Sequence, residues 1–229
     1  RGDGLKLIGF EPARNLQQEA QVGTTKIIND FFNFEAFAKQ FPDDKAKVIT
    51  TIAMFYDLED PNSFVSDIIK CLAVDGIWII QMSYLPSMLE QNAFDNICHE
   101  HLEYYSLLAV QTLLERHRLQ VIDVELNDVN GGSFRLYVTR QGEGPSWSEG
   151  AKRVTALKEK ERIMGVHNEA TYEAFAKRVA NLRSQLLNLV ADVTSSGKKI
   201  YVYGASTKGN TLLQYYDLDF AVIRGAAER

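Results

Sequence analysis

Short apolar runs alternate with longer amphipathic segments up to Met82. The runs predict four strands, at Leu5–Phe10, Lys26–Ile28, Ala46–Ile52 and Ile77–Met82. Strands alternating with helices at this spacing predict right-handed βαβ units and a parallel sheet. The fourth run is nearly all apolar, as expected for a strand whose two faces are both covered.

The segments between these runs predict helices, and the pattern changes after the fourth strand. The expected helices are Ala13–Val22, Phe31–Phe41, Asp60–Leu72 and Leu107–Arg116, with a tight turn at Asp75–Gly76 before the fourth strand. Leu119–Leu126 and Phe134–Arg140 then predict a hairpin-like pair of strands, which adds an antiparallel edge to the sheet.

A Gly/Pro-rich stretch, Gln141–Pro145, divides the chain. We therefore expect an α/β domain over residues 1–145. Ser146–Ser195 predicts a long charged helical segment broken near Gly165, and Lys198–Tyr203 predicts a strand that turns into a helix. Residues 146–229 are thus expected to hold this helical segment and the start of a second, Rossmann-like domain. Both ends of the chain look cut, which predicts an internal piece of a longer protein.

Composition and charge narrow the class of protein. The chain has 229 residues, 45% of them hydrophobic and 24% charged, as in ordinary globular proteins. A net charge of -5 without a basic stripe argues against a nucleic-acid partner. Cys71 and Cys98 are far apart, which favours a reducing, cytoplasmic setting and no structural zinc within the chain. No apolar run approaches the roughly 20 residues of a membrane span, and Arg1–Gly4 does not form a signal peptide.

The densest chemistry lies in Cys98–Ser106, which holds two histidines, two glutamates and two tyrosines. It follows the last parallel strand, where open α/β sheets place their sites. Acid–base work is the favoured interpretation, with one histidine taking a proton and Glu100 assisting it. A helix cap with a hydrogen-bonded histidine is the structural alternative. Metal binding is disfavoured, because His99 and His101 do not lie one helical turn apart as in HExxH.

Three further candidates follow the first three strands. Glu11 is suited to bind ribose hydroxyls, or is a solvated loop glutamate. Asp30 and Phe31 are suited to hydrogen-bond and stack on adenine, or form a helix cap and a core ring. Ala53–Met54 would line the sulfonium end of a cofactor, or form a buried strand end. All three lie at one edge of the expected single sheet, which favours a shared ligand.

Two glycine-containing turns complete the candidates. In Asn130–Arg135 the paired glycines allow close backbone approach and Arg135 could clamp an anion, although Asn-Gly is equally typical of a plain hairpin turn. In Tyr203–Thr211 the free amides of a helix start and Lys208 suit a phosphate. The alternative there is a simple strand-to-helix turn, and the Walker A pattern is not matched.

Five stretches carry a resemblance to a known family. They are Gly9–Pro12, Asp30–Phe32, Cys98–Ser106, Gly131–Arg135 and Tyr203–Leu213. Together they resemble the S-adenosylmethionine-dependent C-methyltransferases that act on nucleotide-linked deoxysugars. The resemblance spans essentially the whole chain and implies a class I methyltransferase sheet with an antiparallel edge pair, followed by a C-terminal Rossmann-like domain. An N-terminal zinc-binding domain and a glycine-rich loop, both parts of that family, are not in this chain, so any zinc would be held outside it.

The resemblance also implies roles for individual residues. Glu11 would bind the cofactor ribose, Asp30 and Phe31 the adenine, and Ala53 and Met54 the methionine end. His101 would be the general base, with Glu100 and His99 beside it. The expected substrate contacts are Tyr84, Cys98, Tyr104, Tyr105, Asn130, Arg135 and Lys208. The chain departs from the family at Cys98 and Asn130, where sugar enzymes often carry tyrosine and histidine.

The leading hypothesis is C-methylation of a nucleotide-linked keto-deoxysugar or a similar small carbonyl compound, with S-adenosyl-L-methionine as methyl donor. Methylation of oxygen or nitrogen on the same scaffold is the second. A non-catalytic sugar-nucleotide binding module is the third, and a nicotinamide-dependent oxidoreductase is a weaker option. The oligomeric state is left open.

Overall fold

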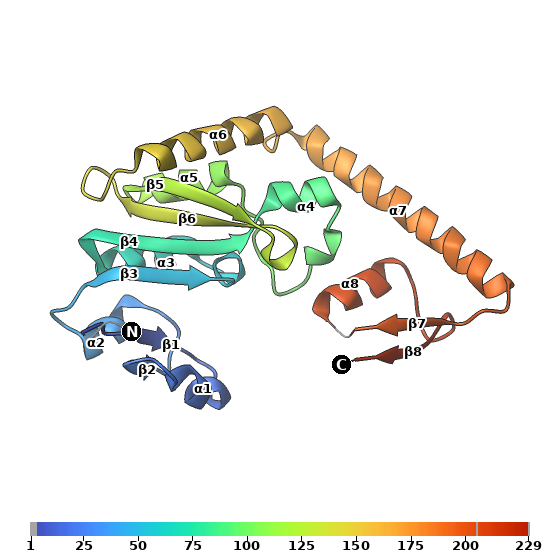
Figure 1. The fold of residues 1–229 in the computed structure, drawn as a ribbon, viewed down its shortest axis with the longest axis horizontal. Coiled ribbons are helices and arrows are strands. Elements are labelled where there is room, and N and C mark those ends of the chain that lie inside the picture. Colours follow the sequence, from blue (N-terminus) through green and yellow to red (C-terminus); the bar gives the residue numbers. More distant parts are fainter. Residues whose placement is uncertain (1–3, 205, 229) are drawn as a thin grey trace.

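A central mixed sheet forms the core of the computed structural model, which describes residues 4–204 and 206–228 (Figure 1). Its strands lie in the order β3-β4-β6-β5. Their bounds are β3 Ala46–Ile52, β4 Leu72–Ser83, β5 Leu119–Asn127 and β6 Ser133–Arg140. β3 and β4 are parallel, whereas β6 is antiparallel to both β4 and β5. The predicted α/β class and its antiparallel edge pair are therefore confirmed.

Two short strands, β1 (Ile8–Phe10) and β2 (Lys26–Ile28), pair in parallel as a separate two-stranded sheet near β3 (Figure 1). The prediction of one continuous sheet carrying the first three strands is wrong in this respect. Strands of three residues make few ladder hydrogen bonds, and β1 and β2 make theirs with each other. On one face of β3, Val48 is 57% and Ile52 58% exposed.

The strand β4 begins earlier than expected. The tight turn predicted at Asp75–Gly76 lies inside the strand, so that prediction is wrong. The register with β3 passes from Ala46 opposite Leu72 to Val48 opposite Ile77, and this irregularity accommodates the turn-forming pair. One face of the far end of β4 is buried, with Trp78, Ile80 and Met82 at most 1% exposed, whereas Ile77 and Ile79 on the other face are partly exposed.

Helices pack on one face of the central sheet and extend beyond it (Figure 1). Their bounds are α1 Gln17–Gln21, α2 Phe34–Gln40, α3 Pro61–Cys71, α4 Leu85–Gln91, α5 Leu107–Arg116, α6 Ser148–Met164, α7 Glu169–Ser195 and α8 Thr207–Tyr215. Short 3-10 turns lie at Arg14–Leu16 (η1), Phe55–Asp57 (η2), Phe94–Asn96 (η3) and Val129–Gly131 (η4). The first predicted helix is therefore shorter than expected, because a 3-10 turn occupies its start.

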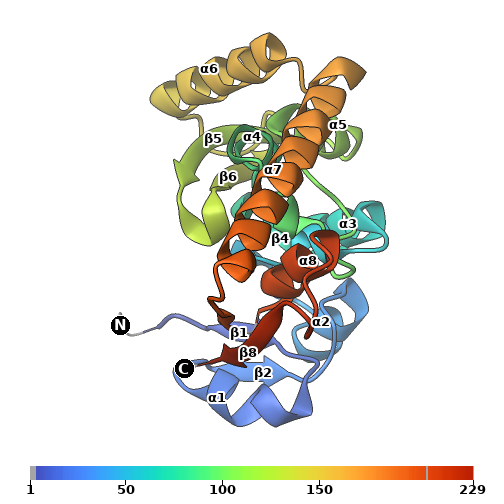
Figure 2. The same cartoon turned by 90° about the vertical axis from the view of Figure 1, so that its right-hand side faces the viewer.

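The predicted break near Gly165 is confirmed. Gly165 ends α6 in the left-handed conformation, and α7 then leads away to a β7–α8–β8 unit (Figures 1 and 2). β7 (Ile200–Tyr203) and β8 (Ile223–Ala227) are parallel, which is the strand–helix–strand start expected of a Rossmann-like domain. Ala205 in the turn before α8 lies outside the described residues.

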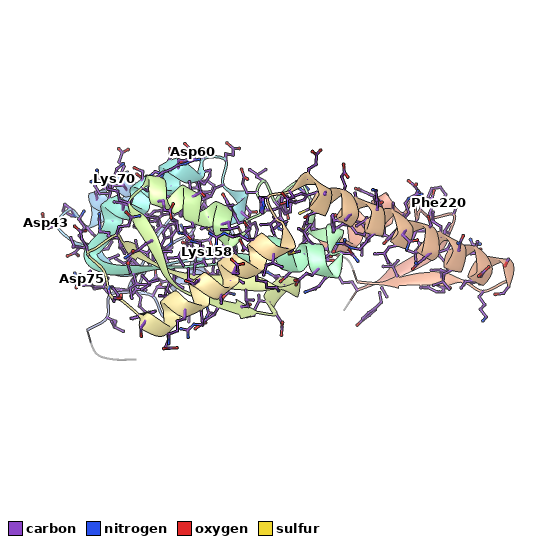
Figure 3. All side chains as sticks on the ribbon, turned by 90° about the horizontal axis from the view of Figure 1, so that it is seen from above. Asp43, Asp60, Lys70, Asp75, Lys158 and Phe220 are labelled. Carbon is purple, nitrogen blue, oxygen red and sulfur yellow. The ribbon has the colours of Figure 1, made fainter. Side chains whose placement is uncertain are left out.

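The helix α6 runs alongside β5, the edge strand of the central sheet (Figure 1), and carries Lys158, labelled in the view from above (Figure 3). Its Val154 and Leu157 belong to the main hydrophobic core, and Arg153 pairs with the buried Asp123 of β5. The expected boundary between residues 145 and 146 stays a prediction, but α6 packs with the residues before that boundary.

A second hydrophobic cluster joins the C-terminal segment to α4 and η3. Phe94 contacts the rings of Tyr215 and Tyr216, with centroids 4.7 and 5.7 Å away. Arg178 of α7 donates hydrogen bonds to Asn92 and to the carbonyl oxygen of Leu89, both at 2.7 Å. The β7–α8–β8 unit is thereby packed beside the loop that follows α4.

Candidate active site

A small cavity of about 10 Å³ lies near the carboxyl end of β4. It is formed by η2, the start of α4, η3, the segment 98–106 and the turn between β5 and β6. Its lining residues are Tyr56, Ser83, Tyr84, Leu85, Met88, Asn96, His101, Glu103, Tyr104, Gly131 and Gly132. Of the residues expected at the site, His101, Tyr84 and Tyr104 are thus brought together.

The imidazole of His101 is fixed by a backbone carbonyl group. Its Nδ1 lies 2.8 Å from the carbonyl oxygen of Asn96. Because a carbonyl oxygen only accepts, Nδ1 must carry the proton of this hydrogen bond. In the neutral imidazole, Nε2 then holds the free lone pair and is the basic nitrogen. The Tyr104 hydroxyl donates to the same oxygen at 3.3 Å.

Tyr56 anchors the segment that carries His101. The backbone N–H groups of Leu102 and Glu103 both donate to the carbonyl oxygen of Tyr56 at 3.0 Å. The rings of Tyr56 and His101 meet edge to face, with centroids 4.6 Å apart. Burial raises the pKa of the Tyr56 hydroxyl, and the nearby Asp57 and Cys98 raise it further. The tyrosine is therefore a neutral wall that restricts rotation of the imidazole.

Tyr84 also lines the cavity and is 1% exposed. Its ring packs on Phe134 at 4.9 Å, and its backbone N–H donates to the carbonyl oxygen of Gly132 at 3.1 Å. Its hydroxyl donates to Glu161 at 2.9 Å. Burial and the Glu161 carboxylate raise its pKa far above the ordinary range, so this hydroxyl stays protonated.

The other members of the predicted catalytic group lie outside the cavity lining. The side chain of His99 is 84% exposed and that of Glu100 is 57% exposed, with 4.0 Å between His99 Nε2 and Glu100 Oε1. Cys98 is half-buried, and its carbonyl oxygen accepts from the backbone N–H of His101 at 3.2 Å. Of the two histidines and Glu100, only His101 lines the cavity, together with Glu103 and Tyr104 of the same segment.

The remaining predicted substrate residues are distributed over three places. Tyr105 is 7% exposed and packs on Phe55 in the core, and burial raises its pKa to about 12. Arg135 donates from Nε and Nη2 to Gln81 at 3.0 and 2.6 Å, so its guanidinium is held on the sheet. Lys208 Nζ donates to the carbonyl oxygen of Asn130 at 3.2 Å, which brings two predicted residues from distant parts of the chain together beside Gly131.

The predicted cofactor residues lie at the ends of β1, β2 and β3. The Glu11 carboxylate accepts from the Ala13 N–H at 2.8 Å, and Asp30 accepts from the Phe31 N–H at 2.8 Å. Phe31 is 74% exposed, which excludes the alternative of a core ring. Ala53 has a φ of +54°, a left-handed conformation that is costly for alanine.

Sequence reasoning missed several residues of the cavity. Asn96 fixes His101 through its backbone carbonyl group. Every residue type has such a group, so the sequence gives no signal for this role. Glu103 and Ser83 line the cavity but carry no distinctive motif. Glu161 lies in a helix whose charge pattern predicts solvent exposure, yet it is fully buried.

Within residues 4–204 and 206–228, no group of three or more His, Cys, Asp or Glu side chains is placed to hold a metal ion. In the same ranges, no helix has both the length and the apolar character needed to cross a membrane.

The arrangement defines an α/β protein with a histidine beside the carboxyl end of its sheet, and comparison with known proteins gives the class. Residues 1–124 match the family model described as a methyltransferase domain. Residues 128–229 match the model described as a C-methyltransferase C-terminal domain. The chain belongs to the methyltransferase family, and the predicted class is confirmed.

A curated relative is similar over nearly the whole chain. The C-methyltransferase NovU of Streptomyces niveus is 33% identical over 227 residues, which is 98% of this chain and 53% of the relative. The chain thus spans about half the length of the curated relative it matches.

Solved structures with a related fold are more distant. The PH0226 protein from Pyrococcus horikoshii is 13% identical, with a TM-score of 0.45 over 60% of this chain and 73% of that one. The N-methyltransferase NodS from Bradyrhizobium japonicum is 11% identical, with a TM-score of 0.42 over 59% and 74%. At this level of similarity neither bears on the chemistry of this chain.

Proposed function

We propose that this chain carries out S-adenosyl-L-methionine-dependent methylation of carbon, on a nucleotide-linked keto-deoxysugar or a similar small carbonyl compound. The observation that carries the proposal is the hydrogen bond from His101 Nδ1 to the Asn96 carbonyl oxygen. It leaves Nε2 as a base in the wall of the cavity, as removal of a proton from a carbon acid requires. The reaction then needs little beyond this base and correct placement of the acceptor.

The donor supplies an electrophilic methyl group. Glu11, Asp30 and Phe31 would hold its nucleoside part, since a carboxylate suits ribose hydroxyls and an exposed phenylalanine ring suits a stacked base. The 74% exposure of Phe31 fits this role, because a bound adenine would cover an apolar ring that is otherwise exposed to solvent. The strained Ala53 and its neighbour Met54 would line the methionine end, and strain of this kind is frequent at functional sites.

The acceptor would lie beside Tyr84, Tyr104 and His101, and the cavity of about 10 Å³ that they line would have to widen to admit it. His101 Nε2 would take a proton from the carbon next to the carbonyl group. The resulting enolate carbon would bond to the methyl group as the methyl–sulfur bond of the donor breaks and S-adenosylhomocysteine leaves. The contact between Lys208 and Asn130 places an ammonium group near the glycine pair of the cavity, where it would suit the phosphates of a nucleotide-linked sugar. Cys98 and Asn130, the two departures from the sugar enzymes, are the positions at which we expect the acceptor to differ.

The cytoplasm is the proposed setting, since the free cysteines fit a reducing compartment. NovU is named a C-methyltransferase, which favours carbon over oxygen or nitrogen as the methylated atom.

Two measurements test the proposal. Calorimetry with S-adenosylhomocysteine should detect binding by the intact protein, and absence of binding would contradict methylation of carbon and of oxygen or nitrogen alike. An acceptor deuterated at the carbon next to its carbonyl group should lose one deuterium for each methyl group transferred. Retention of all deuterium in a methylated product would point to oxygen or nitrogen instead.

A further inference from the structure

Glu161 is a fully buried carboxylate on α6, with 0% of the residue exposed. Burying a carboxylate is costly unless the lost water contacts are replaced. Three donors replace them here. The Tyr84 hydroxyl lies 2.9 Å away, and the backbone N–H groups of Leu107 and Leu108 lie 2.6 and 2.9 Å away.

The two backbone donors open the helix α5. The first N–H groups of a helix have no partner within it, and the helix dipole favours a negative charge at this end. Ser106 already caps α5 through its side chain, which accepts from the Ala109 N–H at 3.2 Å. Glu161 therefore satisfies the two N–H groups that this cap leaves free, and it does so from another helix more than fifty positions along the chain.

One partner lines the cavity, and the other two follow the segment that carries His101. Tyr84 is one of the walls of the cavity, and the segment with His101 leads directly into α5 through Tyr105 and Ser106. The Leu85 N–H donates to the Tyr105 carbonyl oxygen at 3.0 Å. The start of α4 is therefore also hydrogen-bonded directly to the segment that leads into α5. A single carboxylate thus ties the start of α4, the start of α5 and the helix α6 together.

Glu161 also connects the two matched regions of the chain. It lies within residues 128–229, whereas Tyr84, His101 and Leu107 lie within residues 1–124. The C-terminal region therefore contacts Tyr84, a cavity-lining residue, through the Glu161 carboxylate, which belongs to no recognised motif.

We propose that Glu161 is a positioning residue for methyl transfer. It holds the Tyr84 hydroxyl and the start of α5 so that His101 and Tyr84 keep their spacing. This inference rests on the proposed function for its catalytic consequence, but the structural part stands on the three hydrogen bonds.

Three variants, made in the full-length protein, test the inference. Glu161→Gln keeps the size of the side chain but offers an NH₂ group where an oxygen accepted. Tyr84→Phe removes only the hydroxyl. Leu157→Ala is the matched control: it lies on the same helix, is 7% exposed in the main core and makes no hydrogen bond to the cavity wall through its side chain.

We expect Glu161→Gln and Tyr84→Phe to lower kcat about 10- to 100-fold, the effect of misplacing a reacting group by about an ångström. The KM for S-adenosyl-L-methionine should stay the same. Leu157→Ala should lower the melting temperature but leave kcat unchanged at a temperature where it is folded. Backbone amide exchange over residues 98–108 should be faster in Glu161→Gln than in Leu157→Ala.

Unchanged kcat in both Glu161→Gln and Tyr84→Phe would overturn the inference, as would an equal loss of kcat in Leu157→Ala. If the unaltered protein transfers no methyl group to carbon, the proposed function fails and amide exchange decides the positioning role. Equal exchange rates in Glu161→Gln and Leu157→Ala would then refute it, and selective acceleration in Glu161→Gln would support it.

Discussion

The Nδ1 atom of His101 lies 2.8 Å from the backbone carbonyl oxygen of Asn96. This contact assigns the proton to Nδ1 and the lone pair to Nε2, and the edge of the Tyr56 ring holds the imidazole in place. A histidine fixed in this way is held in one tautomer, with Nε2 available to accept a proton.

Replacing His101 by alanine should therefore remove the base. We expect His101→Ala to lower kcat by about 100- to 10,000-fold, the range for loss of an acid–base group. The affinity for S-adenosylhomocysteine should be nearly unchanged. His117→Ala is the control, since His117 pairs with Asn62 at 3.1 Å and does not line the cavity. A collapse of cofactor binding in His101→Ala would mean that this histidine is structural.

The exposed ring of Phe31 should matter for the cofactor and not for stability. An aromatic pair contributes about 0.5–1.5 kcal/mol beyond buried area. We therefore expect Phe31→Ala to weaken S-adenosylhomocysteine binding about two- to tenfold by calorimetry, with an unchanged melting temperature. Phe220 is 88% exposed in the C-terminal segment and provides the matched control, Phe220→Ala (Figure 3). Equal affinities in the two variants would show that adenine binds elsewhere.

Gly132 should tolerate no side chain, because its place in the cavity wall leaves no room for one. An added Cβ would lie 2.6 Å from Ser87 Cβ, and the backbone φ is +121°. At Gly131, whose φ is +83°, a Cβ would meet nothing within 4 Å. We expect Gly132→Ala to destabilise the protein by about 1–3 kcal/mol more than Gly131→Ala, the usual cost of overpacking. Chemical denaturation measures the difference, and equal losses would rule out the collision.

The pair of Arg153 and Asp123 should make stability depend on pH. Two hydrogen bonds from the guanidinium, at 2.8 and 2.6 Å, hold the pKa of Asp123 below its usual value. Stability from this pair is complete above the ordinary carboxyl pKa and is lost as the pH falls through the lowered pKa. Arg153→Met should therefore reduce the melting temperature strongly at about pH 7 and much less at about pH 2, well below the ordinary carboxyl pKa of about 4.

The control for that experiment is Lys152→Met on the same helix. Its ion pair with Glu149 leaves both side chains mostly exposed, at 73% and 68%, and exposed pairs contribute little. We expect the melting temperature of Lys152→Met to match that of the unaltered protein at both pH values. A constant deficit for Arg153→Met across the range would mean that the arginine acts through packing and not through charge.

Much of the fold was predictable because it follows from local patterns. Apolar runs of period two and a glycine at the helix break determine the central sheet and the α6–α7 junction. The separate pairing of β1 with β2 was not predictable, since sequence does not reveal which edges of short strands meet. The turn predicted at Asp75–Gly76 was wrong because a residue pair that favours turns is equally suited to an irregularity within a strand.

The site shows the same division. The dense proton-transfer groups of residues 98–106 pointed to a histidine base, and the family resemblance selected His101 and added Tyr84 and Tyr104. The carbonyl group of Asn96 and the carboxylate of Glu161 act through tertiary contacts. A backbone oxygen has no residue type, and a glutamate in a charged helix is indistinguishable from its exposed neighbours until the helix is placed.

The most direct test of the account is the destination of the methyl group. S-adenosyl-L-methionine labelled with ¹³C in the methyl group should be incubated with a nucleotide-linked keto-deoxysugar, and the product should be examined by NMR. The account predicts a labelled methyl group bonded to the carbon next to the carbonyl group, with no such product from His101→Ala. A labelled methyl group on oxygen or nitrogen, or an undiminished carbon-methylated product from His101→Ala, would contradict it.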